Sequence, residues 1–308
     1  MSLLNYHACQ VALELCGDDL TKLSKTKGNI EAIGQLLEPY VDDRKLVLVP
    51  RFNGGYISFR YCGLEVLRLS LKGQYETCIE LTDGRIRGIK RPKEVTVLGD
   101  LKPLLDKIKE FLDAYVHDFP TAAKTRRQDK TVPGFFLEHW LESMILADTA
   151  IGKTARDHLG LNQDLQRVVS QAPVILNPMA GKRMARHRHI DLLSVNSDGR
   201  IIVVELKKDN DLDTAIKELE VYTSWLLRDG KGGDFHPVRG NPLAMVREHY
   251  LPDVPNAYSD LLAKDIEAVA VVVTPRHSAP AQLSNGVKLR VVELPKDWLS
   301  RDGSIFFE

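Results

Sequence analysis

The feature that most constrains the fold of this chain is a pair of apolar runs separated by a short polar turn. The runs span 190–195 and 201–206, and the residues between them read Asn-Ser-Asp-Gly. Both runs are rich in Ile, Val and Leu, and glycine supplies the positive φ that a tight connection needs. The stretch therefore predicts a β-hairpin.

The length of the hairpin loop decides which residues face one another. If the loop is the three residues 197–199, the numbers of facing positions sum to 396, and Asp191 lies opposite Glu205. Period-2 alternation then keeps Glu205 and Lys207 on one face. A two-residue turn would shift the register by one and place Asp191 on the other face. We expect the three-residue loop.

Both faces of this hairpin are apolar near the turn, and its charges gather at the open end. Strands that are apolar on both faces are usually covered on both sides. Burying ionised groups costs several kcal/mol each unless they are paired or bind a metal. One interpretation is therefore a buried carboxylate–lysine ion pair, or a frayed strand end with solvated charges. The other is a divalent-metal site, in which Asp191, Glu205 and the carbonyl of Leu206 bind Mg²⁺ (or Mn²⁺) and Lys207 orients the attacking water.

An Asp on one strand followed by Glu-x-Lys on the next resembles the PD-(D/E)XK nuclease superfamily. The resemblance continues into 213–227, which looks like the superfamily helix that carries a Gln and a Tyr at helical spacing. Tyr222 matches the Tyr, and Glu218 occupies the position of the Gln. The Pro of the motif is absent, since Ile190 precedes Asp191.

Upstream, 135–145 resembles the first helix of that fold, which often carries a supporting Glu. Glu138 and Glu142 both qualify, and four residues apart they share a helix face. The spacing is similar to that of archaeal and actinobacterial mismatch and single-strand endonucleases, and the likeness covers about 133–295. It implies a Mg²⁺-dependent deoxyribonuclease that acts in repair, restriction or defence. As catalytic residues it implies Asp191, Glu205, Lys207, Glu218 and Tyr222.

The chain is expected to hold two domains. The resemblance implies an α/β domain over 134–308, with a restriction-endonuclease-like mixed sheet flanked by helices. Before it, 1–118 predicts a smaller α+β domain with an antiparallel meander, and 119–133 predicts a linker. Whether the first domain supplies specificity or the interface of a homodimer stays open.

Individual elements follow from local patterns. Helices are predicted at 3–15, 30–37, 101–116, 134–148, 164–170 and 212–227, and strands outside the meander at 172–176, 267–274 and 287–294. The segment 229–260, rich in Gly and Pro, predicts a long insertion.

The net charge does not indicate a nucleic-acid partner, because 42 basic residues balance 42 acidic ones. A basic run does precede the hairpin directly, and charge beside a metal site would hold a DNA backbone. The candidate DNA-binding residues are Lys182, Arg183, Arg186, Arg188 and Lys208.

The cysteines and the lengths of the apolar segments indicate where the protein acts, and two other functions compete with the nuclease. The four cysteines fit neither a zinc site nor a redox pair, and no segment approaches 18 uninterrupted apolar residues. A cytoplasmic protein that binds no membrane is expected. The alternative to a nuclease is a module on the same fold that binds nucleic acid or a protein partner without cleavage; a folded scaffold with an incidental ion pair is a third reading.

Overall fold

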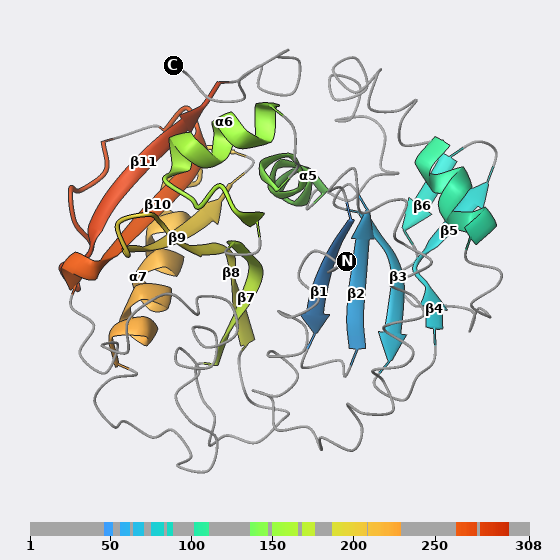
Figure 1. Ribbon diagram of the computed structural model, residues 1–308, viewed down its shortest axis with the longest axis horizontal. Coiled ribbons are helices and arrows are strands. Elements are labelled where there is room, and N and C mark those ends of the chain that lie inside the picture. The colour runs from blue at the N-terminus through green and yellow to red at the C-terminus, as the bar shows by residue number, and fades with distance from the viewer. Residues whose placement is uncertain are drawn as a thin grey trace, which may run out of the picture.

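The computed structural model describes thirteen segments of the chain: 46–51, 56–61, 64–70, 75–82, 85–88, 102–110, 136–146, 150–165, 168–175, 187–207, 209–228, 263–275 and 278–295. The helices predicted at 3–15 and 30–37, the linker 119–133 and the insertion 229–260 lie outside these segments. The described elements form a mixed α/β structure (Figure 1).

The C-terminal half is built on a five-stranded mixed sheet with the order β11-β10-β9-β8-β7. Its strands are β7 (Val168–Ile175), β8 (His187–Val195), β9 (Ile201–Leu206), β10 (Ile266–Val273) and β11 (Lys288–Leu294). The first three strands pair antiparallel, while β9, β10 and β11 run parallel. The central strand β9 therefore has one antiparallel and one parallel neighbour.

The hairpin between β8 and β9 has the predicted three-residue loop. Leu192 pairs with Val204 and Val195 with Ile201, so the numbers of facing residues sum to 396. The loop closes with a hydrogen bond of 3.0 Å from the Asn196 N–H to the Arg200 carbonyl, and Gly199 has a φ of +78°. The expected register is confirmed, and the two-residue alternative is wrong.

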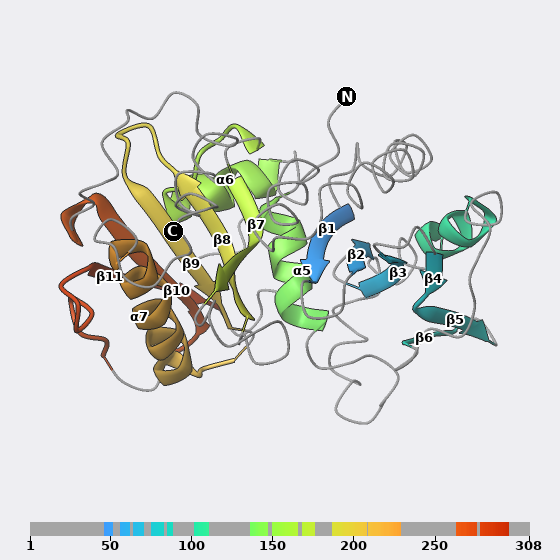
Figure 2. The same cartoon turned by 90° about the horizontal axis from the view of Figure 1, so that it is seen from below.

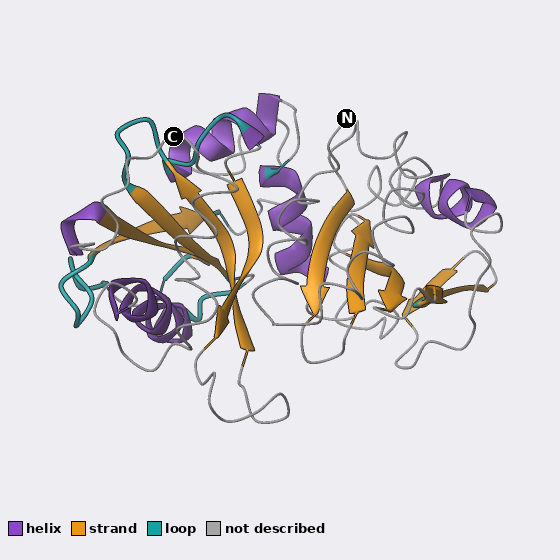
Figure 3. Cartoon of the chain, turned by 60° about the horizontal axis from the view of Figure 1, so that its bottom comes forward, coloured by secondary structure: helices purple, strands orange, loops and turns teal. Residues whose placement is uncertain are grey.

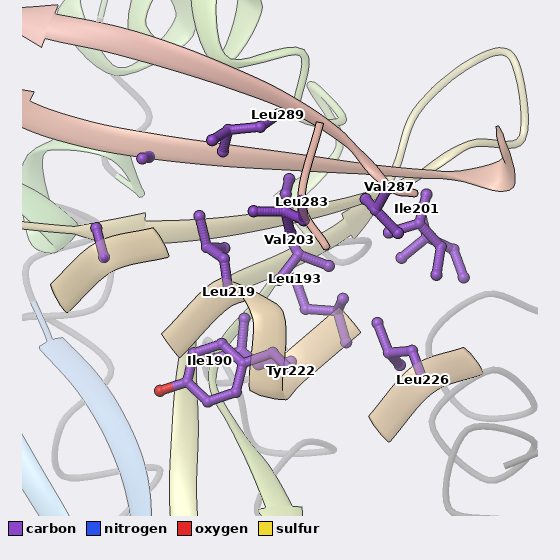
Figure 4. Packing of buried hydrophobic residues seen from close by; sticks show 14 of the residues in the cluster. Ile190, Leu193, Ile201, Val203, Leu219, Tyr222, Leu226, Leu283, Val287 and Leu289 are labelled. Atoms are coloured by element: carbon purple, nitrogen blue, oxygen red, sulfur yellow. The ribbon is translucent and has the colours of Figure 1, made fainter. Parts of the chain in front are cut away.

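Helices cover both faces of this sheet, as the apolar pattern of the hairpin requires. All six residues of β9 are buried. Helix α7 (Leu212–Arg228) packs on one face, and α6 (Ala150–Leu159) lies over the other (Figure 3). Between α7 and the sheet, side chains such as Leu193, Val203 and Leu219 form a continuous apolar core (Figure 4).

The N-terminal half forms an antiparallel sheet of its own, in agreement with the expected meander. Its order is β1-β2-β3-β4, and β5 and β6 add a separate two-stranded hairpin. The strands are β1 (Leu46–Arg51), β2 (Tyr56–Tyr61), β3 (Leu64–Ser70), β4 (Tyr75–Thr77), β5 (Ile79–Thr82) and β6 (Arg85–Gly88). A helix follows at 102–110, within the predicted 101–116.

Helix α5 (Phe136–Ile145) lies between the two sheets (Figure 2). It lies against both β3 and β9, and β1 approaches β7. The helix therefore joins the N-terminal sheet to the C-terminal one. No helix among the segments that the structure describes is long and apolar enough to cross a membrane.

Two local predictions are wrong between α5 and the hairpin. The segment 164–170 is not helical, because β7 already begins at Val168, where two β-branched residues favour a strand. No element is predicted at 150–159, yet α6 forms there. The buried Arg156 side chain ties this polar helix to α5, since its Nη1 donates to the Ile145 carbonyl at 2.7 Å.

Candidate functional site

Several charged side chains meet at the open end of the β8–β9 hairpin. Asp191 is on β8, Glu205 is near the end of β9, and Lys207 follows that strand directly. Glu218 reaches them from α7 and Glu142 from α5. We call these five residues the carboxylate cluster. Elements from both sides of the sheet contribute to it.

Lys207 is held between two carboxylates. Its Nζ donates to Glu205 Oε1 at 2.5 Å and to Glu218 Oε2 at 2.7 Å. Burial lowers the pKa of Lys207, but the two carboxylates outweigh burial and raise that pKa above its ordinary value. The ammonium therefore stays protonated across the physiological range. It can donate hydrogen bonds and supply positive charge, but it cannot accept a proton.

Glu205 is the most deeply buried acid of the hairpin, with 4% of its surface exposed. Lys207 binds its Oε1, whereas its Oε2 is buried and has no hydrogen-bond partner among the described residues. Burial raises the pKa of Glu205 well above its usual range, and the negative charges of Asp191 and Glu218 add to the increase. This carboxylate is thus only partly compensated by the protein.

Asp191 is bound by two N–H donors. The backbone amide of Leu206 donates to its Oδ2 at 2.8 Å, and the side chain of Gln171 donates to its Oδ1 at 3.0 Å. Burial and the nearby Glu142 raise the pKa of Asp191 to about 7, and the Leu206 hydrogen bond offsets only part of this. Over the whole residue, Asp191 belongs to the intermediate class between buried and exposed. Leu206 thus contacts Asp191 through its backbone amide. Its own carbonyl is the predicted metal ligand.

The two supporting glutamates lie on α5, one turn apart. Glu142 is 2% exposed and accepts hydrogen bonds from the Ser170 hydroxyl and, at 3.4 Å, from the Gln171 amide. Glu138 is half-buried, and its charge contributes to the raised pKa of Asp191. Both residues therefore act on Asp191, with Glu142 exerting the stronger effect.

The two candidates on α7 have different environments. Glu218 binds Lys207 and keeps 24% of its side chain exposed. Tyr222 is buried and belongs to the apolar core between α7 and the sheet (Figure 4). The environment of Tyr222 is that of a packing residue, whereas Glu218 belongs to the charged site.

Four residues of this region are not predicted by the sequence pattern. Ser170 and Gln171, on β7, contact Glu142 and Asp191, while His139 and Arg60 continue the contacts of Glu142 toward the N-terminal sheet. A lone glutamine beside a serine has no spacing that indicates a site. Cross-strand counting from Asp191 would find Gln171 only if the register of β7 were known.

Of the candidate DNA-binding residues, Arg188 is on β8, and the structure describes its backbone. Lys182, Arg183, Arg186 and Lys208 lie outside the described residues. The predicted contact of this basic run with a phosphate backbone stays a prediction.

The carboxylate cluster fits a hard divalent cation in its chemistry. Two carboxylates bind one ammonium, Asp191 and Glu142 lie beside them, and one buried oxygen of Glu205 has no partner in the described part of the chain. Within the same described segments, no three acidic, imidazole or thiol side chains converge as a complete metal cage. Mg²⁺ does not need such a cage, because it usually binds one or two carboxylates and keeps several waters. Asp191 and Glu205 can meet that requirement.

Comparisons of this chain with protein-family models, with curated proteins and with solved structures find no match.

Proposed function

We propose that this protein is a Mg²⁺-dependent (or Mn²⁺-dependent) nuclease that hydrolyses phosphodiester bonds in DNA. The observation that carries the proposal is the juxtaposition of Asp191, Glu205 and Lys207 at the open end of one hairpin, with a buried Glu205 oxygen unpaired among the described residues. Groups with strongly raised pKa values gather at functional sites more often than elsewhere.

The order of elements also supports the proposal. Helices α5 and α6 are followed by the antiparallel strands β7, β8 and β9, then by α7 and the parallel strand β10. A restriction-endonuclease-like domain, expected from the motif resemblance, requires a first helix, a mixed sheet and a helix after the Glu-x-Lys strand. The carboxylate cluster lies at the end of the central strand.

Asp191, Glu205 and the Leu206 carbonyl would hold the cation. Bound Mg²⁺ would neutralise the charge that develops on the phosphate and the leaving oxygen. Lys207 would donate a hydrogen bond to the attacking water and orient it, as its persistent protonation allows. Because Lys207 keeps its own proton, the proton of the attacking water would pass to a phosphate oxygen of the substrate or to solvent, and the leaving oxygen would take a proton from solvent. Glu142 and Glu218 would keep Asp191 and Lys207 in place.

One observation favours the alternative, a module that binds nucleic acid or a protein partner without cutting. Both Glu205 and Glu218 already bind the Lys207 ammonium, which closes an ion-paired group without any metal. A purely structural ion pair would have this geometry. It would not, however, require Asp191 to be buried beside Glu142 and Glu205, where each charge raises the pKa of a neighbour.

Cleavage assays separate these functions. Single-stranded, double-stranded, mismatched and forked DNA would be incubated with the protein in Mg²⁺, in Mn²⁺ and in chelator. The variant Lys207→Met removes the ammonium but keeps the bulk, and Lys217→Met, on the exposed face of α7, is the matched control. We expect metal-dependent cutting by the wild type and the control, and none by Lys207→Met.

Two other outcomes would overturn the nuclease proposal. If all three proteins retard DNA but none cuts it, the binding module is the better description. If none binds DNA, and neither Mg²⁺ nor Mn²⁺ raises the thermal midpoint of the wild type, the cluster is a structural ion pair.

A further inference from the structure

Gln171 has an unfavourable backbone conformation beside the carboxylate cluster. Its φ is +52°, in the left-handed region, and Thr274 is the one other non-glycine residue with positive φ in the described segments. Such a conformation costs of the order of 1 kcal/mol or more, and it persists where the surroundings enforce it. Gln171 is only 4% exposed, so this is not a surface loop residue whose conformation is left to solvent.

The register of β7 and β8 explains what this conformation accomplishes. Ser170 pairs with Leu192 and Ala172 with Ile190, which places Gln171 directly across from Asp191. In a regular strand neighbouring side chains point to opposite faces. Here the neighbours Ser170 and Gln171 both donate to Glu142, and Gln171 also donates to Asp191. The left-handed residue breaks the alternation and turns both donors toward the acids.

The contacts of Glu142 continue through His139 into the N-terminal sheet. Arg60 of β2 is 5% exposed, and its Nη1 lies 2.5 Å from Nε2 and 2.7 Å from Nδ1 of His139. His139 Nδ1 also lies 3.3 Å from Glu142 Oε2. In the tautomer that carries its hydrogen on Nδ1, this N–H can donate to Glu142 while Nε2 accepts from Arg60. A row of side chains thus runs from Arg60 through His139, Glu142 and Gln171 to Asp191.

We propose that Gln171 is a positioning residue for Asp191, and that Arg60, acting through His139 and Glu142, holds Gln171 in its strained conformation. The N-terminal sheet would then be part of the candidate active site. This inference rests on the proposed function for its effect on cleavage. Its effects on metal affinity and on stability do not depend on cleavage.

The first test replaces Gln171 with glycine, which relieves the backbone strain and deletes the amide. We expect a thermal midpoint at or above that of the wild type, together with Mn²⁺ affinity and cleavage each reduced about 10- to 100-fold, the usual effect of losing a partner of a metal ligand. Thr274→Gly is the matched control, because it gives the same backbone freedom at the other left-handed residue. It should leave Mn²⁺ affinity and cleavage unchanged.

A merely structural Gln171 gives a different pattern. The thermal midpoint of Gln171→Gly would then fall and cleavage per folded molecule would not change, or Mn²⁺ affinity would match that of the wild type. Either result would overturn the positioning role.

The second test asks whether Arg60 acts through the same row. Arg60→Met keeps an unbranched apolar stem and removes the guanidinium with its charge. His139→Leu interrupts the row at the half-buried α5 position, should Arg60→Met not fold. Either variant should weaken Mn²⁺ binding several-fold in the wild type and have no further effect in Gln171→Gly. Additive losses would show that Arg60 and Gln171 act independently, and the proposed row would be wrong.

The inference can fail separately from the proposed function. If the wild type binds Mn²⁺ but cuts no DNA, nuclease function is excluded, and the titrations above still decide the role of Gln171. If it binds no Mn²⁺, the thermal midpoints of Arg60→Met, Asp191→Asn and the double variant decide. Non-additive shifts support the row, and additive shifts overturn it.

Discussion

Two buried glutamates on neighbouring strands of the same sheet have opposite electrostatic settings. Glu267, at the start of β10, accepts from Arg290 at 2.7 Å and from Arg200, beside the hairpin turn, at 3.2 Å. These arginines outweigh burial and lower the pKa of Glu267. Glu205, at the open end of the hairpin, shares one lysine with Glu218 and has a raised pKa.

The difference in pKa means that ionised Glu267 stabilises the fold, whereas ionised Glu205 destabilises it. Glu267 joins β10 to the hairpin loop before β9 and to β11. Arg290 also donates to the carbonyls of His158 and Leu159, so the network fastens α6 to the sheet. Glu205 is joined through Lys207 to Glu218 of α7, but both acids share that one ammonium, and the Oε2 of Glu205 has no partner among the described residues. Its burial beside Asp191 makes sense if a cation or a substrate group completes the site.

The largest expected difference is in catalysis. Glu205→Gln should reduce metal-dependent cleavage about 10²–10³-fold, because a ligand and its charge are lost. Glu267→Gln should leave cleavage per folded molecule near that of the wild type, but lower the free energy of unfolding by about 1–3 kcal/mol, because Arg290 loses a charged partner. Cleavage assays together with urea unfolding measure both. If both variants lost cleavage to the same extent, the two glutamates would not differ in function.

Metal binding should stabilise only the protein with an intact open end. Mg²⁺ at 100 times its dissociation constant should add about 2.7 kcal/mol to the free energy of unfolding. The increase should persist in Glu267→Gln and disappear in Glu205→Gln. Thermal unfolding with and without Mg²⁺ tests this, and Ca²⁺ addition shows whether any divalent cation suffices. A similar increase in Glu205→Gln would place the metal elsewhere.

The stability of the metal-free protein should depend on pH in the direction set by the raised acids. Asp191 has a folded-state pKa of about 7 against an ordinary 3.8, so the folded state holds its proton more tightly. The contribution of Asp191 to stability is therefore fully present below about pH 3.8 and is lost as pH rises through about 7. Between pH 5.5 and 8.0 the loss from Asp191 should be about 2 kcal/mol.

Urea unfolding in chelator at those two pH values measures this loss. Asp191→Asn should remove most of it. Glu267 has a lowered pKa, so its stabilising contribution is present above its ordinary value of 4.5 and disappears only at lower pH. A wild type that is more stable at pH 8.0 than at pH 5.5 would contradict the assignment of Asp191.

The smallest effect is expected at the turn. Gly199→Ala adds a methyl group into open space, but Gly199 has a φ of +78°, so the variant should lose about 1 kcal/mol of stability. Gly199→Asn should lose less, since Asn tolerates the left-handed region. Cleavage per folded molecule should not change in either variant, as chemical unfolding and cleavage assays would show. A large loss of cleavage would mean that the turn end also contributes to the site.

The sequence by itself determined the hairpin and its register. The decisive contacts are local: Gly199 takes the left-handed conformation, Asn196 closes the loop on Arg200, and alternation then brings Glu205 and Lys207 together. Helix α7 and the parallel strands were also predictable, because long periodic runs record which face is buried. Each of these features depends on residues close together in the chain.

The tertiary structure alone decided how the open end is completed. Gln171 lies 20 residues before Asp191, and no short turn fixes the register between their strands. Arg60 lies 79 residues from His139, on a different sheet, so no periodicity could indicate their contact. The raised pKa of Asp191 likewise arises from burial and from Glu142 on another helix. Long-range packing determines how far a charged side chain is removed from water and which partners it has. Sequence spacing determines only the face of the strand or helix on which that side chain lies.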